Sequence, residues 1–114
     1  MTYIQLLDVL LERGFIYDRN AAVVANAKAL PNGEYGLVLL CLKENTLFIY
    51  DIDFHHNVGD LLYKIDLAKA SAFKSSSFIF NRYLKFIYEG FHYKLVDFGN
   101  AKCFLQALFS EMNK

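Results

Sequence analysis

Hydrophobic and polar residues alternate most clearly between residues 78 and 98, which are predicted to form a long β-hairpin. The first strand is rich in aromatic and β-branched residues, which favour a pleated surface. Glu89 and Gly90 predict a tight turn, because glycine readily adopts the positive φ of hairpin turns. The alternation predicts an apolar face that carries Phe78, Phe80, Leu84, Phe86 and Tyr88 on the first strand and Phe91, Tyr93 and Leu95 on the second.

One amphipathic helix is predicted after the hairpin, over residues 100–112. Asn100 follows the break in alternation at residues 97–99 and is the predicted N-cap. Apolar residues then recur at helical spacing: Ala101, Phe104, Leu105, Leu108, Phe109 and Met112. We expect this helix to close one end of a sheet and to pack on it through Phe104, Leu105, Leu108 and Phe109.

Upstream, the pattern predicts an additional N-terminal helix over residues 1–14, capped by Thr2 and ended by Gly14. Alanine content at residues 21–30 allows a helix, but Val23, Val24 and the turn at 31–33 favour a strand. Further strands are predicted at 35–42, 47–50, 61–65 and 67–75, with a loop at 51–60 and a turn at 75–77. The 35–42 segment is nearly all apolar, which indicates cover on both faces.

The predicted fold class is therefore mainly β (α+β). Residues 21–98 form a bent antiparallel sheet or partly open barrel of about seven strands, because consecutive strands must curl to bury their apolar face. Residues 100–112 close it. At 114 residues, with 55% hydrophobic residues and a single proline, the chain is expected to be one ordered domain, 1–114.

Charge narrows the range of partners. Twelve basic residues balance twelve acidic ones, which argues against nucleic acid as a partner. The two halves differ, however: residues 1–57 hold four basic and seven acidic residues, whereas residues 58–114 hold eight and five. Cys41 and Cys103 lack metal-ligand spacing and are expected to be reduced, in a cytoplasmic protein. No apolar run reaches the ~20 residues of a membrane-spanning helix, and Asp8, Glu12 and Arg13 interrupt any signal-peptide core.

The order of these elements resembles the pleckstrin-homology-like fold, in particular its small bacterial and GRAM-like versions. The resemblance lies in the hairpin at 36–50, the strand at 63–67 and the hairpin at 83–98 that leads into a helix, and it covers residues 21–113. It implies binding of phosphoinositide headgroups, or of peptides and other domains. The turn at 28–35 carries only Lys28, offset by Glu34, where headgroup binding needs several cations. We therefore predict no headgroup-selective binding.

Candidate catalytic groups are few. His55 and His56, flanked by Asp51 and Asp53, have the chemistry of metal ligands or a general base. Adjacent side chains on an extended segment point in opposite directions, so a surface loop is favoured. Residues 97–99 match the kinase Asp-Phe-Gly motif without its companion motifs. The sequence therefore predicts no catalytic residue, no metal, no cofactor and no enzyme activity.

Two features point to a binding surface. Six basic residues fall on or near neighbouring predicted strands: Lys64, Lys69, Lys74, Arg82, Lys85 and Lys94. If they converge, they suit an acidic partner or an anionic membrane; otherwise they are solvent-facing residues that discourage edge pairing. Nineteen aromatic residues also exceed what a small core comfortably buries, and the candidates for exposure are Tyr17, Tyr35, Phe54 and Tyr83. The alternative is a tightly packed aromatic core.

These observations predict a non-enzymatic interaction module that binds a protein or peptide through a strand edge or an aromatic groove. A second hypothesis is the binding of a lipid or other amphipathic ligand in the open end of the sheet, or weak contact with an anionic membrane. Homo-oligomerisation is left open. The predicted partner-binding residues are Tyr35, Phe54, Lys64, Lys74, Arg82, Tyr83, Lys85 and Lys94.

Overall fold

The computed structural model describes residues 1–113, in which seven strands form one antiparallel sheet in the order β4-β3-β2-β1-β7-β6-β5. Every neighbouring pair in this order is antiparallel. The elements are α1 (Tyr3–Glu12), η1 (Arg19–Ala21), β1 (Ala22–Ala29), β2 (Gly36–Lys43), β3 (Thr46–Ile52), β4 (Val58–Asp66), β5 (Ser71–Phe78), β6 (Asn81–Tyr88), β7 (Phe91–Val96) and α2 (Ala101–Met112).

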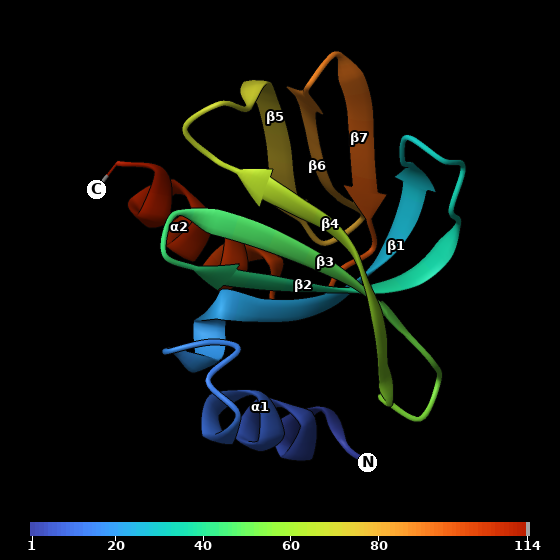
Figure 1. The fold of residues 1–114 in the computed structure, drawn as a ribbon, viewed down its shortest axis with the longest axis vertical. Coiled ribbons are helices and arrows are strands. Elements are labelled where there is room, and N and C mark those ends of the chain that lie inside the picture. Colours follow the sequence, from blue (N-terminus) through green and yellow to red (C-terminus); the bar gives the residue numbers. More distant parts are fainter. Residues whose placement is uncertain (114) are drawn as a thin grey trace.

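The sheet is bent at β1 and is not closed into a barrel (Figure 1). We call β1–β4 the first arm and β5–β7 the second arm. The arms are joined where β1 pairs with β7, and the register there shifts between Ala27 and Ala29. Strands β4 and β5 form the two edges. The predicted mainly β fold, with a bent antiparallel sheet, a closing C-terminal helix and an additional N-terminal helix, is therefore confirmed.

At its strand β2 the first arm is covered on both faces. All five residues from 38 to 42 of β2 are buried, as the unbroken apolar run predicts. Helix α1 lies against the outer face of this arm, on the side away from the second arm (Figure 1). Its Tyr3 hydroxyl donates a hydrogen bond of 2.7 Å to the carbonyl of Ala22. Farther along, the ring of Phe15 stacks on Tyr50 at 5.4 Å. The predicted cap is also present, because Thr2 forms a capping box with Gln5.

The space between the arms is filled by apolar side chains, including a ladder of four aromatic rings. Neighbouring centroids in this ladder are 5.4 Å apart for Phe73–Phe86, 4.8 Å for Phe86–Tyr93 and 5.5 Å for Tyr93–Tyr63. Tyr63 comes from edge strand β4, so the ladder connects the two arms. Burial raises the pKa of Tyr93 to about 12. Among the aromatic residues of β6 and β7, Phe86 and Tyr93 thus belong to the core, whereas Phe91 was predicted on the apolar face but is exposed beside the turn.

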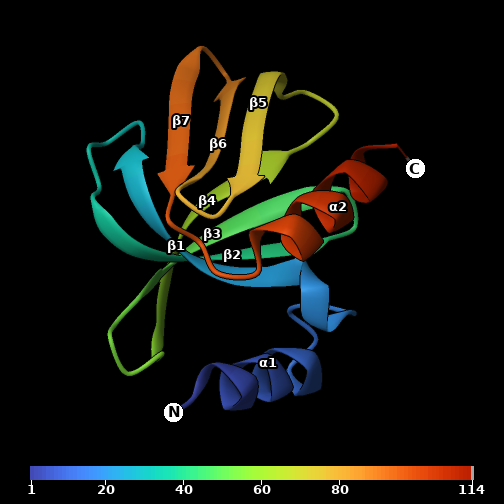
Figure 2. The same ribbon diagram turned by 180° about the vertical axis from the view of Figure 1, so that it is seen from behind.

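Helix α2 lies against η1, β1, β2 and β5 and covers the opening between the arms (Figure 2). Phe104 and Leu108 are fully buried, which confirms the predicted apolar face. Phe109 was expected to pack on the sheet, but it is exposed because it lies at the rim of that face. Asn100 occupies the N-cap position, as predicted, although its side chain forms no capping hydrogen bond.

Several predicted boundaries in the middle of the chain are wrong. The loop predicted at 51–60 is shorter, because β3 continues to Ile52 and β4 begins at Val58. The strand predicted at 67–75 begins later, at Ser71, and the turn predicted at 75–77 lies within β5. Serine is common in turns, but pairing with β6 keeps this segment extended. The turn falls at residues 79–80 instead, which leaves Phe78 and Phe80 exposed rather than on the apolar face.

Candidate functional site

Three lysines lie directly opposite one another on the three strands of the second arm. Lys74 of β5 pairs with Lys85 of β6, and Lys85 in turn pairs with Lys94 of β7. Residues in direct register project from the same face of a sheet, and neighbouring strands are about 4.8 Å apart. We call these three residues the lysine row. Their face is the outer one, because the next pair along, Phe86 and Tyr93, is buried on the inner face.

The lysine row is not neutralised within the molecule. None of the three lysines forms an ion pair with any described residue. Like charges that lie directly opposite one another destabilise a sheet by a few tenths of a kcal/mol or more. The first arm carries no such row on its outer face, where α1 packs. The second arm therefore holds an uncompensated positive charge on its open face.

A cavity of about 420 Å³ lies beside the lysine row. Its lining combines cationic and apolar groups: Ala29, Ala72, Lys74, Lys85, Phe86, Ile87, His92, Tyr93 and Lys94. Ile87 and His92 pair directly across β6 and β7 and so extend the outer face beyond the row. On the other side of the row, the Lys85 ammonium lies 5.4 Å from the ring centroid of Tyr83. The face thus offers charge, apolar surface and one aromatic ring together.

The other predicted binding residues lie elsewhere. The Arg82 guanidinium donates a hydrogen bond of 3.1 Å to the carbonyl of Phe98, so it fastens the segment before α2. Lys64 lies on β4 with its ammonium 5.8 Å from the ring centroid of Phe48, in the first arm. Tyr35 is exposed in the β1–β2 loop, and Phe54 is exposed in the β3–β4 loop. Of the eight predicted residues, the structure brings together Lys74, Lys85, Lys94 and Tyr83.

The β1–β2 loop is held by contacts of its own. Lys28 donates a hydrogen bond of 3.1 Å to the Tyr35 hydroxyl. The Tyr63 hydroxyl donates to the carboxylate of Glu34 at 2.7 Å and accepts from the backbone N–H of Asn32 at 3.1 Å. Burial and the hydrogen bond to Glu34 raise the pKa of Tyr63. The loop thus presents a single lysine, which contacts a tyrosine rather than a cluster of cations.

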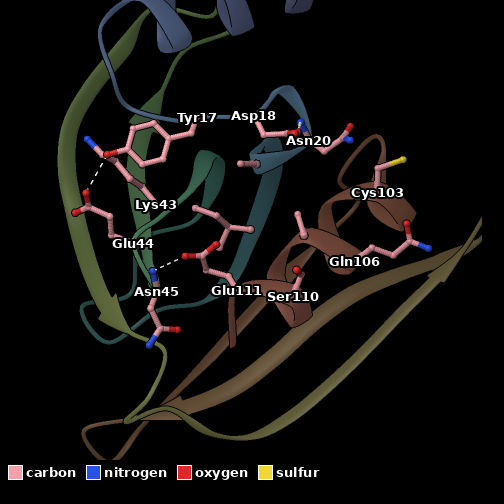
Figure 3. A pocket seen from close by; sticks show the side chains of 13 residues that line it. Tyr17, Asp18, Asn20, Lys43, Glu44, Asn45, Cys103, Gln106, Ser110 and Glu111 are labelled. Carbon is pink, nitrogen blue, oxygen red and sulfur yellow. Dashed lines mark hydrogen bonds between the residues drawn. The ribbon is translucent and has the colours of Figure 1, made fainter. Parts of the chain in front are cut away.

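A larger cavity of about 640 Å³ lies between α2, η1 and the β2–β3 turn (Figure 3). Several of its polar groups are held by hydrogen bonds, although the buried Oδ1 of Asn45 has no partner among the described residues. The Tyr17 hydroxyl donates to Glu44 at 2.9 Å, and the Lys43 ammonium donates to the Gly14 carbonyl at 2.6 Å. Beside Glu44, the backbone N–H of Asn45 donates to the Glu111 carboxylate of α2 at 2.7 Å (Figure 3). The contact between Asn45 and Glu111 fastens α2 to the first arm, whereas the other two hold the segment after α1 against the end of β2.

The larger cavity also includes a thiol, that of Cys103. Cys103 of α2 lines this cavity (Figure 3), and among residues 1–113 no hydrogen bond joins its thiol to a basic side chain. Nucleophilic catalysis needs a base within hydrogen-bond reach of the nucleophile. The carboxylate of Asp18 accepts a hydrogen bond of 2.7 Å from the backbone N–H of Asn20, which caps η1. The cavity thus lies at a polar seam between α2, η1 and the β2–β3 turn.

His55 and His56 lie in the short loop between β3 and β4. The loop is organised by Asp53, whose carboxylate accepts hydrogen bonds from the backbone N–H of His55 at 2.8 Å and of Asn57 at 2.9 Å. The hydrogen bonds from Asn57 lower the pKa of Asp53. Nδ1 of His56 lies 3.0 Å from the Met1 carbonyl, so this ring contacts the start of the chain. Among residues 1–113, no group of three or more His, Cys, Asp or Glu side chains is placed to hold a metal ion.

Comparisons with models of protein families, with curated proteins and with solved structures found no match for this chain. No helix among the described residues is long and apolar enough to cross a membrane. The site must therefore be interpreted from its own geometry.

Sequence reasoning missed two features of the second arm. One is the contribution of Ile87 and His92 to the cavity beside the lysine row, which depends on cross-strand register. The other is the exposed apolar turn at residues 78–80, of which Phe78 and Phe80 were assigned to the apolar face of a strand. A signal was present, because three consecutive apolar residues cannot all lie on one face of an alternating strand.

Proposed function

We propose that this protein is a non-enzymatic interaction module of pleckstrin-homology-like fold that binds an acidic protein or peptide segment on the outer face of β5–β7. The observation that carries the proposal is the lysine row, in which Lys74, Lys85 and Lys94 lie in register without ion-pair partners among the described residues. An acidic partner relieves the repulsion between the three cations and gains three favourable charge pairs. Charge complementarity of this kind supplies specificity and speeds association.

The position of the row at a sheet edge supports an extended partner. β5 pairs with β6 on one side, and no described strand pairs with its other side. An extended segment that adds to a strand edge gains main-chain hydrogen bonds, and its alternate side chains lie beside Lys74. Acidic residues at those alternate positions then face the row. Tyr83 and Ile87 supply apolar contact on either side of Lys85, the central residue of the row.

The filled interior favours a partner on the surface over a ligand inside the sheet. A carrier of an amphipathic molecule needs a deep apolar cavity of ligand size. Here the space between the arms holds the aromatic ladder from Phe73 to Tyr63. The two cavities described above instead have polar and charged groups in their linings. We therefore place binding on the outer face of the second arm.

The proposal is tested with a fluorescent oligoglutamate peptide as the probe, using anisotropy titrations at low salt. Lys85→Glu places a negative charge at the centre of the row, and we expect affinity to fall at least about tenfold, a loss equal to about 1.4 kcal/mol. Lys85→Arg retains the charge and should keep most of the affinity. A neutral oligoglutamine peptide should bind none of the three proteins, the parent or the two Lys85 variants.

Lys102→Glu is the matched control, because Lys102 is an exposed lysine of α2 that lies outside the row. It makes the same change in net charge at a distant site. Equal weakening by Lys102→Glu and Lys85→Glu would show that attraction is a diffuse effect of net charge, and the proposed site would be wrong. Affinity should also decline as salt is added, because exposed charges are screened.

A further inference from the structure

The turn between β5 and β6 exposes three consecutive large apolar side chains. Phe78, at the end of β5, is 80% exposed, Ile79 is 75% exposed and Phe80 is 100% exposed. Single exposed apolar residues are common on protein surfaces, but a contiguous group of this kind marks an interaction site. We call these three residues the apolar tip. The lysine row lies four residue pairs away along the same hairpin, so the tip is a separate feature.

The shape of the apolar tip indicates which kind of partner can bury it. A flat protein surface covers one side of a projecting turn, whereas these side chains are exposed over most of their surface. A lipid bilayer encloses an inserted turn from every side and places its apolar groups among acyl chains. The backbone at the tip needs only a shallow position near the headgroups, where water and polar groups still satisfy it.

The charge around the apolar tip suits the same partner. Residues 67–88, which contain both strands of the hairpin, hold four basic residues and no acidic one. Anionic lipids on a membrane surface attract such basic segments. The exposed Phe54 of the β3–β4 loop provides a contrast, because Asp51 and Asp53 precede it closely and would be repelled. We infer that the apolar tip of the β5–β6 hairpin inserts into the interface of a lipid bilayer.

The chain has no tryptophan, so a single introduced indole reports on this contact alone. Phe80→Trp should show a blue-shifted emission with phosphatidylcholine vesicles that contain phosphatidylserine, and lipids brominated on their acyl chains should quench it. Phe54→Trp is the matched control, since Phe54 is 88% exposed on another loop. It should show neither effect. Because apolar burial drives insertion, the shift should persist when salt is raised.

A second substitution measures what the tip contributes. Ile79→Ser in the Phe80→Trp background should lower the vesicle partition coefficient about tenfold, because burial of one large aliphatic side chain contributes that much or more. An unchanged emission spectrum with vesicles would overturn the inference, and so would equal shifts for Phe80→Trp and Phe54→Trp. A blue shift that grows with protein concentration in the absence of lipid would assign the tip to a second copy of the chain instead.

This test is independent of the proposed acidic partner. Lys85→Glu removes oligoglutamate binding if the lysine row is the site, while insertion of the tip into vesicles is scored by acyl-chain quenching. If both assignments are right, Lys85→Glu loses oligoglutamate binding and keeps acyl-chain quenching. Retained oligoglutamate binding in Lys85→Glu would contradict the lysine row alone, and a lack of quenching in Phe80→Trp with Lys85 intact would contradict the apolar tip alone.

Discussion

The two arms of the sheet differ in how their outer faces are treated, although both consist of antiparallel strands. On the first arm α1 packs against the outer face, and every residue of β2 from 38 to 42 is buried. On the second arm the corresponding face carries the lysine row and is open to solvent at Lys74 and Lys85. The inner faces of both arms share one apolar core. A face that is covered contributes to stability, whereas an open face that bears uncompensated charge is available for a partner.

The largest expected effect is a loss of stability on removing buried side chains of the two helices, and it tests whether the packing of α1 on the first arm stabilises the fold. Leu10 of α1 is fully buried, as is Leu108 of α2, which closes the inner side. Each Leu→Ala substitution should lower the free energy of unfolding by roughly 2–5 kcal/mol, through lost burial and a residual cavity. Urea denaturation measures both. A loss under about 1 kcal/mol for Leu10→Ala would show that α1 is peripheral, and the contrast between the arms would fail.

A second expected effect is a loss of stability at alkaline pH, to which one buried group in each arm contributes. Burial raises the pKa of Cys41 from 9.0 to about 12 and is the main reason that the pKa of Tyr93 rises from 10.0 to about 12. The folded protein therefore retains protons that the unfolded chain has lost. Stability from this source is complete below pH 9 and declines as pH rises toward about 12.

Denaturation curves recorded across this pH range measure the decline. Cys41→Ala should make it shallower at its lower end, and Tyr93→Phe should do so at its upper end. Cys103→Ala removes the partly exposed thiol of α2 and serves as the control. An identical decline in all four proteins would show that neither buried group is responsible.

A smaller effect concerns how α1 begins. The Thr2 hydroxyl accepts a hydrogen bond of 3.2 Å from the backbone N–H of Gln5, and the Gln5 side chain accepts one of 2.9 Å from the N–H of Thr2. Thr2→Ala removes one half of this box and should lower the free energy of unfolding by about 1 kcal/mol. Thr46→Ala, in β3, is a matched removal of a threonine outside the helix. Hydrogen exchange should rise in α1 more than in α2 for Thr2→Ala alone.

The smallest effect has the opposite sign and belongs to the second arm. Lys85→Met removes the central charge of the lysine row while keeping a long side chain, so it should raise the free energy of unfolding by about 0.2–1 kcal/mol at low salt. Added salt should shrink the gain, because it screens the repulsion in the parent protein. Lys102→Met should bring no comparable gain. Destabilisation by Lys85→Met would mean that the row is paired in solution, which would contradict its role as an open site.

The elements themselves follow from local patterns in the sequence. Glu89 and Gly90 predict the β6–β7 turn, because glycine readily adopts the positive φ of a tight hairpin. In the structure both residues have a positive φ, 52° and 80°. Thr2 and Gly14 mark the ends of α1 for comparable local reasons. The apolar spacing also predicts which residues of α2 face the core, apart from the rim position Phe109. Such features depend on neighbours a few residues away, so a single sequence specifies them.

The site, by contrast, was decided by the tertiary structure. The alternation of apolar and polar residues predicts which residues share a face of one strand, but it does not predict the register between strands. The lysine row exists because Lys74, Lys85 and Lys94 fall at matching positions of three strands, and a slip of one residue would move a lysine to the other face. Likewise, the local sequence of Ser75 to Ser77 predicts a turn, but in the structure these residues pair with β6. The turn therefore lies farther along the chain, at the apolar tip. Long-range hydrogen bonding and the packing of α1 on one arm alone thus determine which side chains remain exposed to a partner.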